Sequence, residues 1–462
     1  MREAIKLDQN SMIGASNVFI IIPFSTDGIS LVNFQHVDFA EWYKFGQNVD
    51  KECDYEKKLI EPTNTSLMRQ FLDIDKDNYS ENYLRLNPFT RGLICRVNYT
   101  NEMLTGVRVR ILVTYHTDGI GTITLINSLP SMTLKRYFTV IRELKNWDTQ
   151  TISGVEKTTM NEYLFCLFCS EHPQQSEKKR LSIISIGEEY PFFTLGGADV
   201  DIGPLKQFVS NNRALIYGLS HQDLDYGGWE RVREENVNTL LDRDLSRRTD
   251  YGIYLTDVAM LEIDTEARLS FINHWAKKRD TTEENMRLKL HFERVQLLEY
   301  LLMQRFILRK MESEILQYDI SSDTPVRELV KLKNKINTTL SDYYYANAMT
   351  RQHVSGIEWV TYGQNRFHLE KLANHIKDQI GLIESCQQLK NDFNNMRGNY
   401  IFQLISILLG SSAVVNIVDV LIQFPFFTGT WFENNLILIK IIVYALFLIW
   451  IVTLTIKYSK DR

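Results

Sequence analysis

Four polar side chains recur along an apolar segment near the C-terminus of this chain. They are Ser412, Asn416, Asp419 and Gln423. At about 100° of rotation per residue in an α-helix, they fall within an arc of roughly 60° on one helix face. Asp and Asn are energetically unfavourable in hydrocarbon unless they face protein or water. The spacing therefore predicts a water-exposed, ion-attracting helix face.

The same helix face continues towards the N-terminus with the apolar side chains Ile401, Ile405 and Leu408. In a symmetric bundle of several copies, the four polar residues would line a pore. The three apolar residues would narrow it, as in a hydrophobic gate below a polar mouth.

Two other interpretations of this face remain open. Asp419 and Lys440 lie at similar depths in two neighbouring apolar segments, so they could neutralise each other. Asn416 is of the type that joins two helices by a hydrogen bond worth on the order of 1 kcal/mol, and Ser412 fits a small-residue packing patch.

Two apolar segments must position these residues. Residues 401–424 and 436–456 each reach the roughly 20 residues that about 30 Å of hydrocarbon requires at 1.5 Å per residue. Lys and Arg flank the pair on both sides, whereas residues 425–435 contain neither. By the positive-inside rule, we expect a multi-pass protein of the cell inner (plasma) membrane with both termini in the cytoplasm.

Other chemical signals in the sequence are weak. Cys166 and Cys169 form a lone CxxC in a predicted strand, where residues three apart point to opposite faces, so structural cysteines are favoured over a metal site. His368 and His375 are predicted to share one helix face without a ligand cluster. Because P-loop, nucleophile-elbow and HExxH motifs do not occur, we expect no enzyme activity, no catalytic residues and no metal ligands.

Arginines are the expected contacts for any phosphate-bearing ligand, although acidic neighbours favour a solvated helix for most of them. The candidates are Arg108, Arg110, Arg231, Arg233, Arg243, Arg247 and Arg248.

Composition places most of the chain in a water-soluble fold. The 462 residues are 44% hydrophobic and 24% charged, which is ordinary for globular proteins. A net charge of -5 argues against direct nucleic-acid binding. The 5 cysteines form no disulfide framework, and the N-terminus has no signal-peptide core.

The predicted architecture is an α+β cytoplasmic ligand-sensing domain (1–262), a helical stalk (263–399) and a two-helix transmembrane hairpin (400–462). A hairpin turning at Asp118-Gly119 is the clearest local prediction. A helix is predicted over 283–318, and a second, very long helix runs into the first apolar segment. Strands are predicted at 18–24, 107–115, 120–126, 163–169, 181–186, 214–219 and 252–263.

This order of segments resembles the CorA-type cation channels. In that family five subunits place their first spans around the pore and their second spans outside, above a funnel of stalk helices. Its magnesium transporters carry a Gly-Met-Asn signature at the end of the first span. Here residues 424–430 read Phe-Pro-Phe-Phe-Thr-Gly-Thr instead, which speaks against dedicated magnesium transport.

CorA-like proteins without the signature include membrane effectors associated with type III CRISPR systems. The resemblance implies a homopentameric antiviral-defence channel whose cytoplasmic domain binds a nucleotide second messenger, such as an adenosylmethionine-AMP conjugate. Its expected partners are the lipid bilayer, further copies of itself and a small nucleotide, with no covalent cofactor. The alternatives are a transporter gated by its own Mg²⁺ and a non-conducting membrane anchor.

Overall fold

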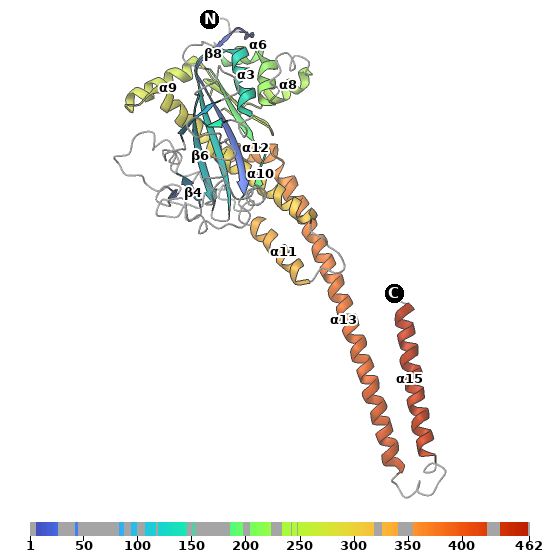
Figure 1. The fold of residues 1–462 in the computed structure, drawn as a ribbon. Coiled ribbons are helices and arrows are strands. Elements are labelled where there is room, and N and C mark those ends of the chain that lie inside the picture. The colour runs from blue at the N-terminus through green and yellow to red at the C-terminus, as the bar shows by residue number, and fades with distance from the viewer. Residues whose placement is uncertain are drawn as a thin grey trace. The chain divides into compact units, whose positions relative to one another are not determined.

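The computed structural model describes two compact units, formed by residues 1–317 with 337–376 and by residues 318–336 with 377–462 (Figure 1). For some residues within the helices, including Leu408 and Asp419, the structure describes the backbone but not the side chain. The described residues are 6–25, 42–44, 83–86, 94–98, 107–116, 119–145, 151–152, 185–196, 204–222, 233–241, 243–246, 248–317, 326–340, 354–422 and 435–460.

A mixed sheet forms the centre of the first unit. Parallel pairing joins β11 to β13, and the other described pairs of strands are antiparallel. In order of pairing, the main strands are β12 (Tyr251–Leu255), β13 (Met260–Asp264), β11 (Tyr190–Leu195), β2 (Ser16–Ser25), β7 (Ile120–Leu129), β6 (Val107–His116), β4 (Tyr83–Leu86) and β3 (Trp42–Lys44).

Short strands extend this arrangement. β10 (Ser185–Ile186) pairs with β2, and β5 (Ile94–Asn98) lies between β6 and β9 (Thr151–Ile152). β1 (Met12–Ile13) and β8 (Met132–Thr133) form a separate two-stranded pair.

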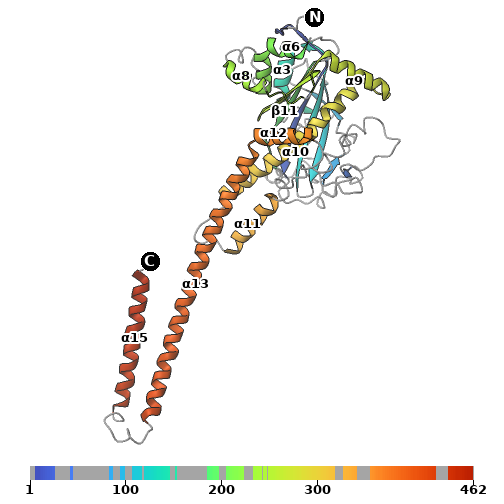
Figure 2. The same cartoon turned by 180° about the vertical axis from the view of Figure 1, so that it is seen from behind.

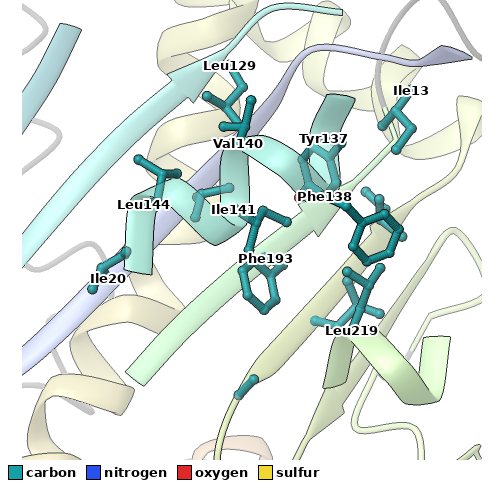
Figure 3. Close-up of a cluster of buried hydrophobic side chains, with 14 of the residues drawn as sticks. Ile13, Ile20, Leu129, Tyr137, Phe138, Val140, Ile141, Leu144, Phe193 and Leu219 are labelled. Atoms are coloured by element: carbon teal, nitrogen blue, oxygen red, sulfur yellow. The ribbon is translucent and has the colours of Figure 1, made fainter. Parts of the chain in front are cut away.

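The apolar core lies on one face of this sheet, under three helices. These are α3 (Leu134–Lys145), α6 (Leu205–Asn211) and α7 (Arg213–Ser220). Alternate residues of β2, such as Ile20, and of β11, such as Phe193, join the buried side chains of these helices in one cluster (Figure 3). Strand side chains alternate between faces, so the intervening residues point towards the opposite layer.

Long helices cover the opposite face. Helix α10 (Glu283–Gln317) packs on β2 and β7, and α12 (Val354–Arg366) packs on α10 (Figures 1 and 2). A Cβ at Gly363 of α12 would lie 2.4 Å from Leu301 Cδ1, so glycine permits the two helices to approach closely. Helices α8 (Glu234–Leu241) and α9 (Glu266–Lys278) complete this unit.

The remaining helices continue the chain to its C-terminus. They are α11 (Val326–Thr339), α13 (Leu369–Ile422) and α15 (Leu436–Lys460). Helix α13 has 54 residues. Within the second unit, Lys333 of α11 and Glu384 of α13 form an ion pair at 2.5 Å.

Several predictions of elements are confirmed. The hairpin is β6 and β7, with Gly119 at φ 89° in its turn. The predicted helix over 283–318 is α10, and the strand over 18–24 lies within β2. The α+β region followed by long helices is therefore the observed fold.

Other predictions of elements are wrong. Residues 214–219 lie in α7 and not in a strand, because a six-residue apolar run fits either element and Leu215, Ile216 and Leu219 have the spacing of a helix face. Residues 252–263 form two strands, β12 and β13, separated by a turn. The strand predicted over 181–186 is described only at β10, and 163–169 lies outside the described residues.

Close packing in the sheet predicts a large effect at Gly121. A Cβ there would lie 2.3 Å from the Thr114 carbonyl oxygen and 2.7 Å from the Phe24 ring. We expect Gly121→Ala to lower the free energy of unfolding by about 2–4 kcal/mol, measured by chemical denaturation of the purified chain.

The matched control is Gly381→Ala in α13, where an added Cβ meets nothing within 4 Å. Because alanine is the better helix former, this change should be neutral or stabilising by up to about 1 kcal/mol. Equal effects of the two substitutions would contradict the packing described for Gly121.

Candidate functional site

The structure places the predicted pore residues on one helix, as far as they are described. Ser412 and Asn416 are exposed on α13, and the backbone of Asp419 belongs to the same helix. The side chain of Asp419 and the whole of Gln423 lie outside the described residues. Pore lining and pairing with Lys440 are therefore both still predictions.

The predicted gate residues also belong to α13. Ile401 and Ile405 are exposed on α13, and the side chain of Leu408 lies outside the described set. Considering the described residues alone, none of the helices combines the length and the apolar character needed to cross a membrane.

A cluster of charged side chains is buried between the sheet and α10. Glu262 and Asp264 are two residues apart in β13, so both point to the face that α10 covers. Helix α10 places His291 and Arg294 opposite them, and Arg268 of α9 lies beside Asp264. Glu262 is 0% exposed and Asp264 is 2% exposed.

Distances within this cluster define two ion pairs. His291 Nε2 lies 3.2 Å from Asp264 Oδ2, and Arg294 Nε lies 3.0 Å from Glu262 Oε2. The second contact lacks the alignment of a hydrogen bond, so both Glu262 oxygens are without a hydrogen-bond donor among the described residues. The guanidinium groups of Arg268 and Arg294 lie 4.5 Å and 5.2 Å from the centre of the Tyr251 ring.

Burial acts differently on the two carboxylates. Burial raises the pKa of Glu262 above its ordinary value of 4.5, and the nearby charges of Arg294 and His291 only partly oppose this effect. Burial also acts to raise the pKa of Asp264, but the hydrogen bond and charge of His291 and the charge of Arg268 outweigh it, so that pKa is lowered. Asp264 is therefore the more readily ionised of the two.

The donor atoms of Glu262, Asp264 and His291 lie within 4.8 Å of one another, close enough to hold a metal ion. Two carboxylates and an imidazole suit a divalent transition metal. Arg294 and Arg268 already place positive charge on the same carboxylates, however, so an incoming cation would have to displace them. We therefore interpret the cluster as a buried ion-pair network.

A second feature is a pocket of about 560 Å³ at the corner between α12 and α13. Its lining residues come from four places in the first unit: the segment after α8, the β12–β13 turn, the end of α12 and the residue that precedes α13. They are Arg243, Asp257, Tyr362, Asn365, Arg366 and His368.

The backbone at this corner is held by buried aromatic packing. Phe367 is buried, and its ring lies 5.4 Å from that of Tyr190 in β11, edge to face. The guanidinium of Arg305 lies 5.4 Å from the same Phe367 ring and donates a hydrogen bond to the Asp257 carbonyl oxygen at 2.7 Å. His368 has φ 56°, a left-handed conformation that breaks the helix between α12 and α13.

This break corrects two sequence predictions. The very long helix is confirmed from Leu369 to Ile422 as α13, but it does not extend back through Phe367 and His368, since His368 leaves the helical backbone conformation. His368 and His375 therefore do not share a helix face. Instead His368 lines the pocket, and His375 Nδ1 lies 2.5 Å from Glu312 Oε1 of α10.

One of the arginines predicted for phosphate binding, Arg243, lines the pocket. Arg248 instead pairs with Asp250 at 3.0 Å, and Arg233 is exposed before α8. Arg110 lies in β6, partly buried. The side chain of Arg108 and residues Arg231, Arg247, Cys166 and Cys169 lie outside the described residues.

Sequence reasoning missed most residues of both features. Glu262 and Asp264 carried one available signal, since two acids alternate with Leu261 and Ile263 in a strand with no exposed position. Their partners lie further along the chain, in α10, and are brought close to them only by folding. The pocket combines residues from 243 to 368 with no shared motif.

Comparisons with protein-family models, with curated proteins and with solved structures found no match for this chain.

The ion-pair network predicts a large effect of removing one partner. Arg294→Met would leave Glu262 buried without its nearest positive charge, so we expect the free energy of unfolding to fall by about 3–5 kcal/mol in chemical denaturation. The double variant Glu262→Leu with Arg294→Met should recover most of this loss. A double variant as unstable as Arg294→Met alone would contradict the pairing.

The same network predicts a pH dependence. Because the pKa of Glu262 is raised above 4.5, the folded state holds this proton more tightly than the unfolded chain does. The contribution of Glu262 to stability is therefore complete below about pH 4.5 and declines as the pH rises through the folded-state pKa. The stability of the wild type should therefore fall as the pH rises above about 4.5, and the stability of Glu262→Gln, which has no such proton to lose, should fall less.

Proposed function

We propose that this chain is the subunit of a homo-oligomeric CorA-like membrane channel, pentameric as in the family it resembles, that is opened by a small nucleotide second messenger. In this proposal the first unit senses the ligand and the C-terminal helices conduct ions. The setting implied by the resemblance is antiviral defence of the type III CRISPR kind. The protein would act as a receptor and channel and not as an enzyme.

The observation that carries the proposal is the apolar surface of the last two helices. Most of the large apolar side chains that are exposed in the described part of the chain belong to residues 401–452. Phe402, Leu409 and Ile437 are 71%, 68% and 75% exposed. So many exposed apolar side chains on two helices are unfavourable in water and call for lipid or protein around them.

The complete sequence supports a bilayer as the surrounding medium. It gives the residue type at every position of α13 and α15, including those whose side chains the structure does not describe. Residues 436–456 contain a single charged side chain, Lys440. At 1.5 Å per residue, a helix of 25 residues is about 37 Å long, enough to cross about 30 Å of hydrocarbon. The flanking Lys and Arg residues favour a hairpin with both ends in the cytoplasm.

The polar face supports conduction over simple anchoring. Ser412, Asn416 and Asp419 lie on a continuous helix, so their common face follows from helical geometry. A non-conducting anchor has no need of an Asp and an Asn within hydrocarbon. The absent Gly-Met-Asn signature favours a ligand-gated channel over a magnesium transporter.

Ion flux through liposomes tests the proposal directly. Purified protein would be reconstituted and flux measured with and without adenosylmethionine-AMP and other adenine nucleotides, at low and at high Mg²⁺. We expect flux that depends on a nucleotide, because a ligand opens a channel only by binding the open state more tightly. Nucleotide-independent flux that Mg²⁺ suppresses would overturn the proposal in favour of a transporter, and no flux would favour an anchor.

Asp419 provides a test of the pore-lining residues. We expect Asp419→Ala to abolish the preference for cations over anions, shifting the reversal potential in a salt gradient to near zero, while the oligomer remains intact. Asp392→Ala is the matched control, since Asp392 is exposed on α13 outside the apolar segment. Loss of the oligomer in Asp419→Ala would instead favour the pairing of Asp419 with Lys440.

A further inference from the structure

We infer that the pocket at the α12–α13 corner binds the phosphate group of a small, hydroxyl-bearing phosphate ester of the nucleotide class, with Arg243 and Arg366 as the principal phosphate contacts. The inference deepens the proposed function and rests on it for the link between binding and ion flow. The binding site itself is argued from the geometry of the pocket.

The charges that line the pocket favour an anion. Arg243 and Arg366 contribute two positive charges against the single carboxylate of Asp257. Among the described residues, the exposed guanidinium of Arg243 has no ion-pair partner.

Arg366 is oriented before any ligand binds. Its Nε donates a hydrogen bond to the Tyr362 hydroxyl at 2.8 Å, and its guanidinium lies 5.3 Å from the centre of the Tyr362 ring. This arrangement uses Nε, and no described residue is hydrogen-bonded to the two terminal nitrogens. Two parallel N–H groups on one rigid plane match two oxygens of a phosphate, and holding them in place reduces the entropy lost on binding.

The other lining groups suit the remainder of a nucleotide. Asp257 and Asn365 are exposed and offer acceptors, and Asn365 also offers a donor, for ribose hydroxyls or a base edge. A volume of about 560 Å³ lies within the range of small-molecule sites, roughly 300–1,000 Å³. Free inorganic phosphate would use only the arginine part of this pocket.

The position of the pocket gives its ligand a route to the C-terminal helices. His368 lines the pocket and also interrupts the helical backbone between α12 and α13. Leu369, directly after it, is buried. The same α13 that begins here carries Ser412 and Asn416. A ligand that joins Arg243 to Arg366 would therefore restrain the corner from which the predicted pore helix starts.

The test uses the full chain, purified in detergent, with AMP as the probe and inorganic phosphate as the minimal competitor. Binding would be measured by calorimetry. We expect Arg366→Gln and Arg243→Gln each to weaken AMP binding at least tenfold, and Arg366→Lys to weaken it nearly as much because lysine keeps the charge but loses the planar pair of donors. Arg327→Gln, at an exposed arginine outside the pocket, is the matched control and should bind AMP as the wild type does.

Circular dichroism and thermal unfolding of each variant separate loss of binding from loss of folding. If the folded Arg243 and Arg366 variants bind AMP with wild-type affinity, or if the wild type binds none, the proposed site is wrong. Liposome flux distinguishes this result from failure of the proposed function. If nucleotide-dependent flux survives in both variants, the activating ligand binds elsewhere. If both variants lose AMP binding but the wild type shows no nucleotide-dependent flux, the binding site is supported and the gating is rejected.

Discussion

Burial of two carboxylates beneath α10 is the constraint on which the first unit depends. Strand β13 can pair with β11 and β12 only by turning Glu262 and Asp264 towards the helix layer, because its alternate residues Leu261 and Ile263 belong to the apolar core. Helix α10 can cover them only by supplying positive charge and a hydrogen-bond donor, which Arg294 and His291 provide. The register of α10 on the sheet is thus tied to charge matching as well as to apolar packing.

This division gives the two faces of the sheet different properties. The face under α3, α6 and α7 is held by close apolar packing, which tolerates conservative exchanges of similar volume. The face under α10 contains ionised and hydrogen-bonded groups, including Thr124, which donates to Glu299 at 2.6 Å. Buried polar contacts are costly when incomplete, so this face specifies one arrangement of α10 more strictly.

The position of α10 in turn determines the α12–α13 corner. Leu301 of α10 receives Gly363 of α12, and Arg305, one helical turn further along α10, supports Phe367 and the β12–β13 turn. The buried charges, the helix packing and the pocket therefore form one connected assembly within the first unit. A ligand at the pocket would act on a corner that Arg305 of α10 supports and from which the chain continues as α13.

The sequence alone determined the elements that depend on local pattern. Alternating apolar residues and Asp118-Gly119 specified the β6–β7 hairpin, and an uninterrupted helical pattern specified α10. The helical spacing of Ser412, Asn416 and Asp419 was also readable, because α13 is continuous there. Tertiary structure decided the rest: residues 214–219 became helical where Leu215 and Ile216 could join the core, and His368 ended a helix whose pattern contained no proline. Folding alone pairs Glu262 with Arg294 and brings Arg243 and Arg366 to the same pocket, since the proximity of distant segments depends on layer packing and leaves no periodic signal in the chain.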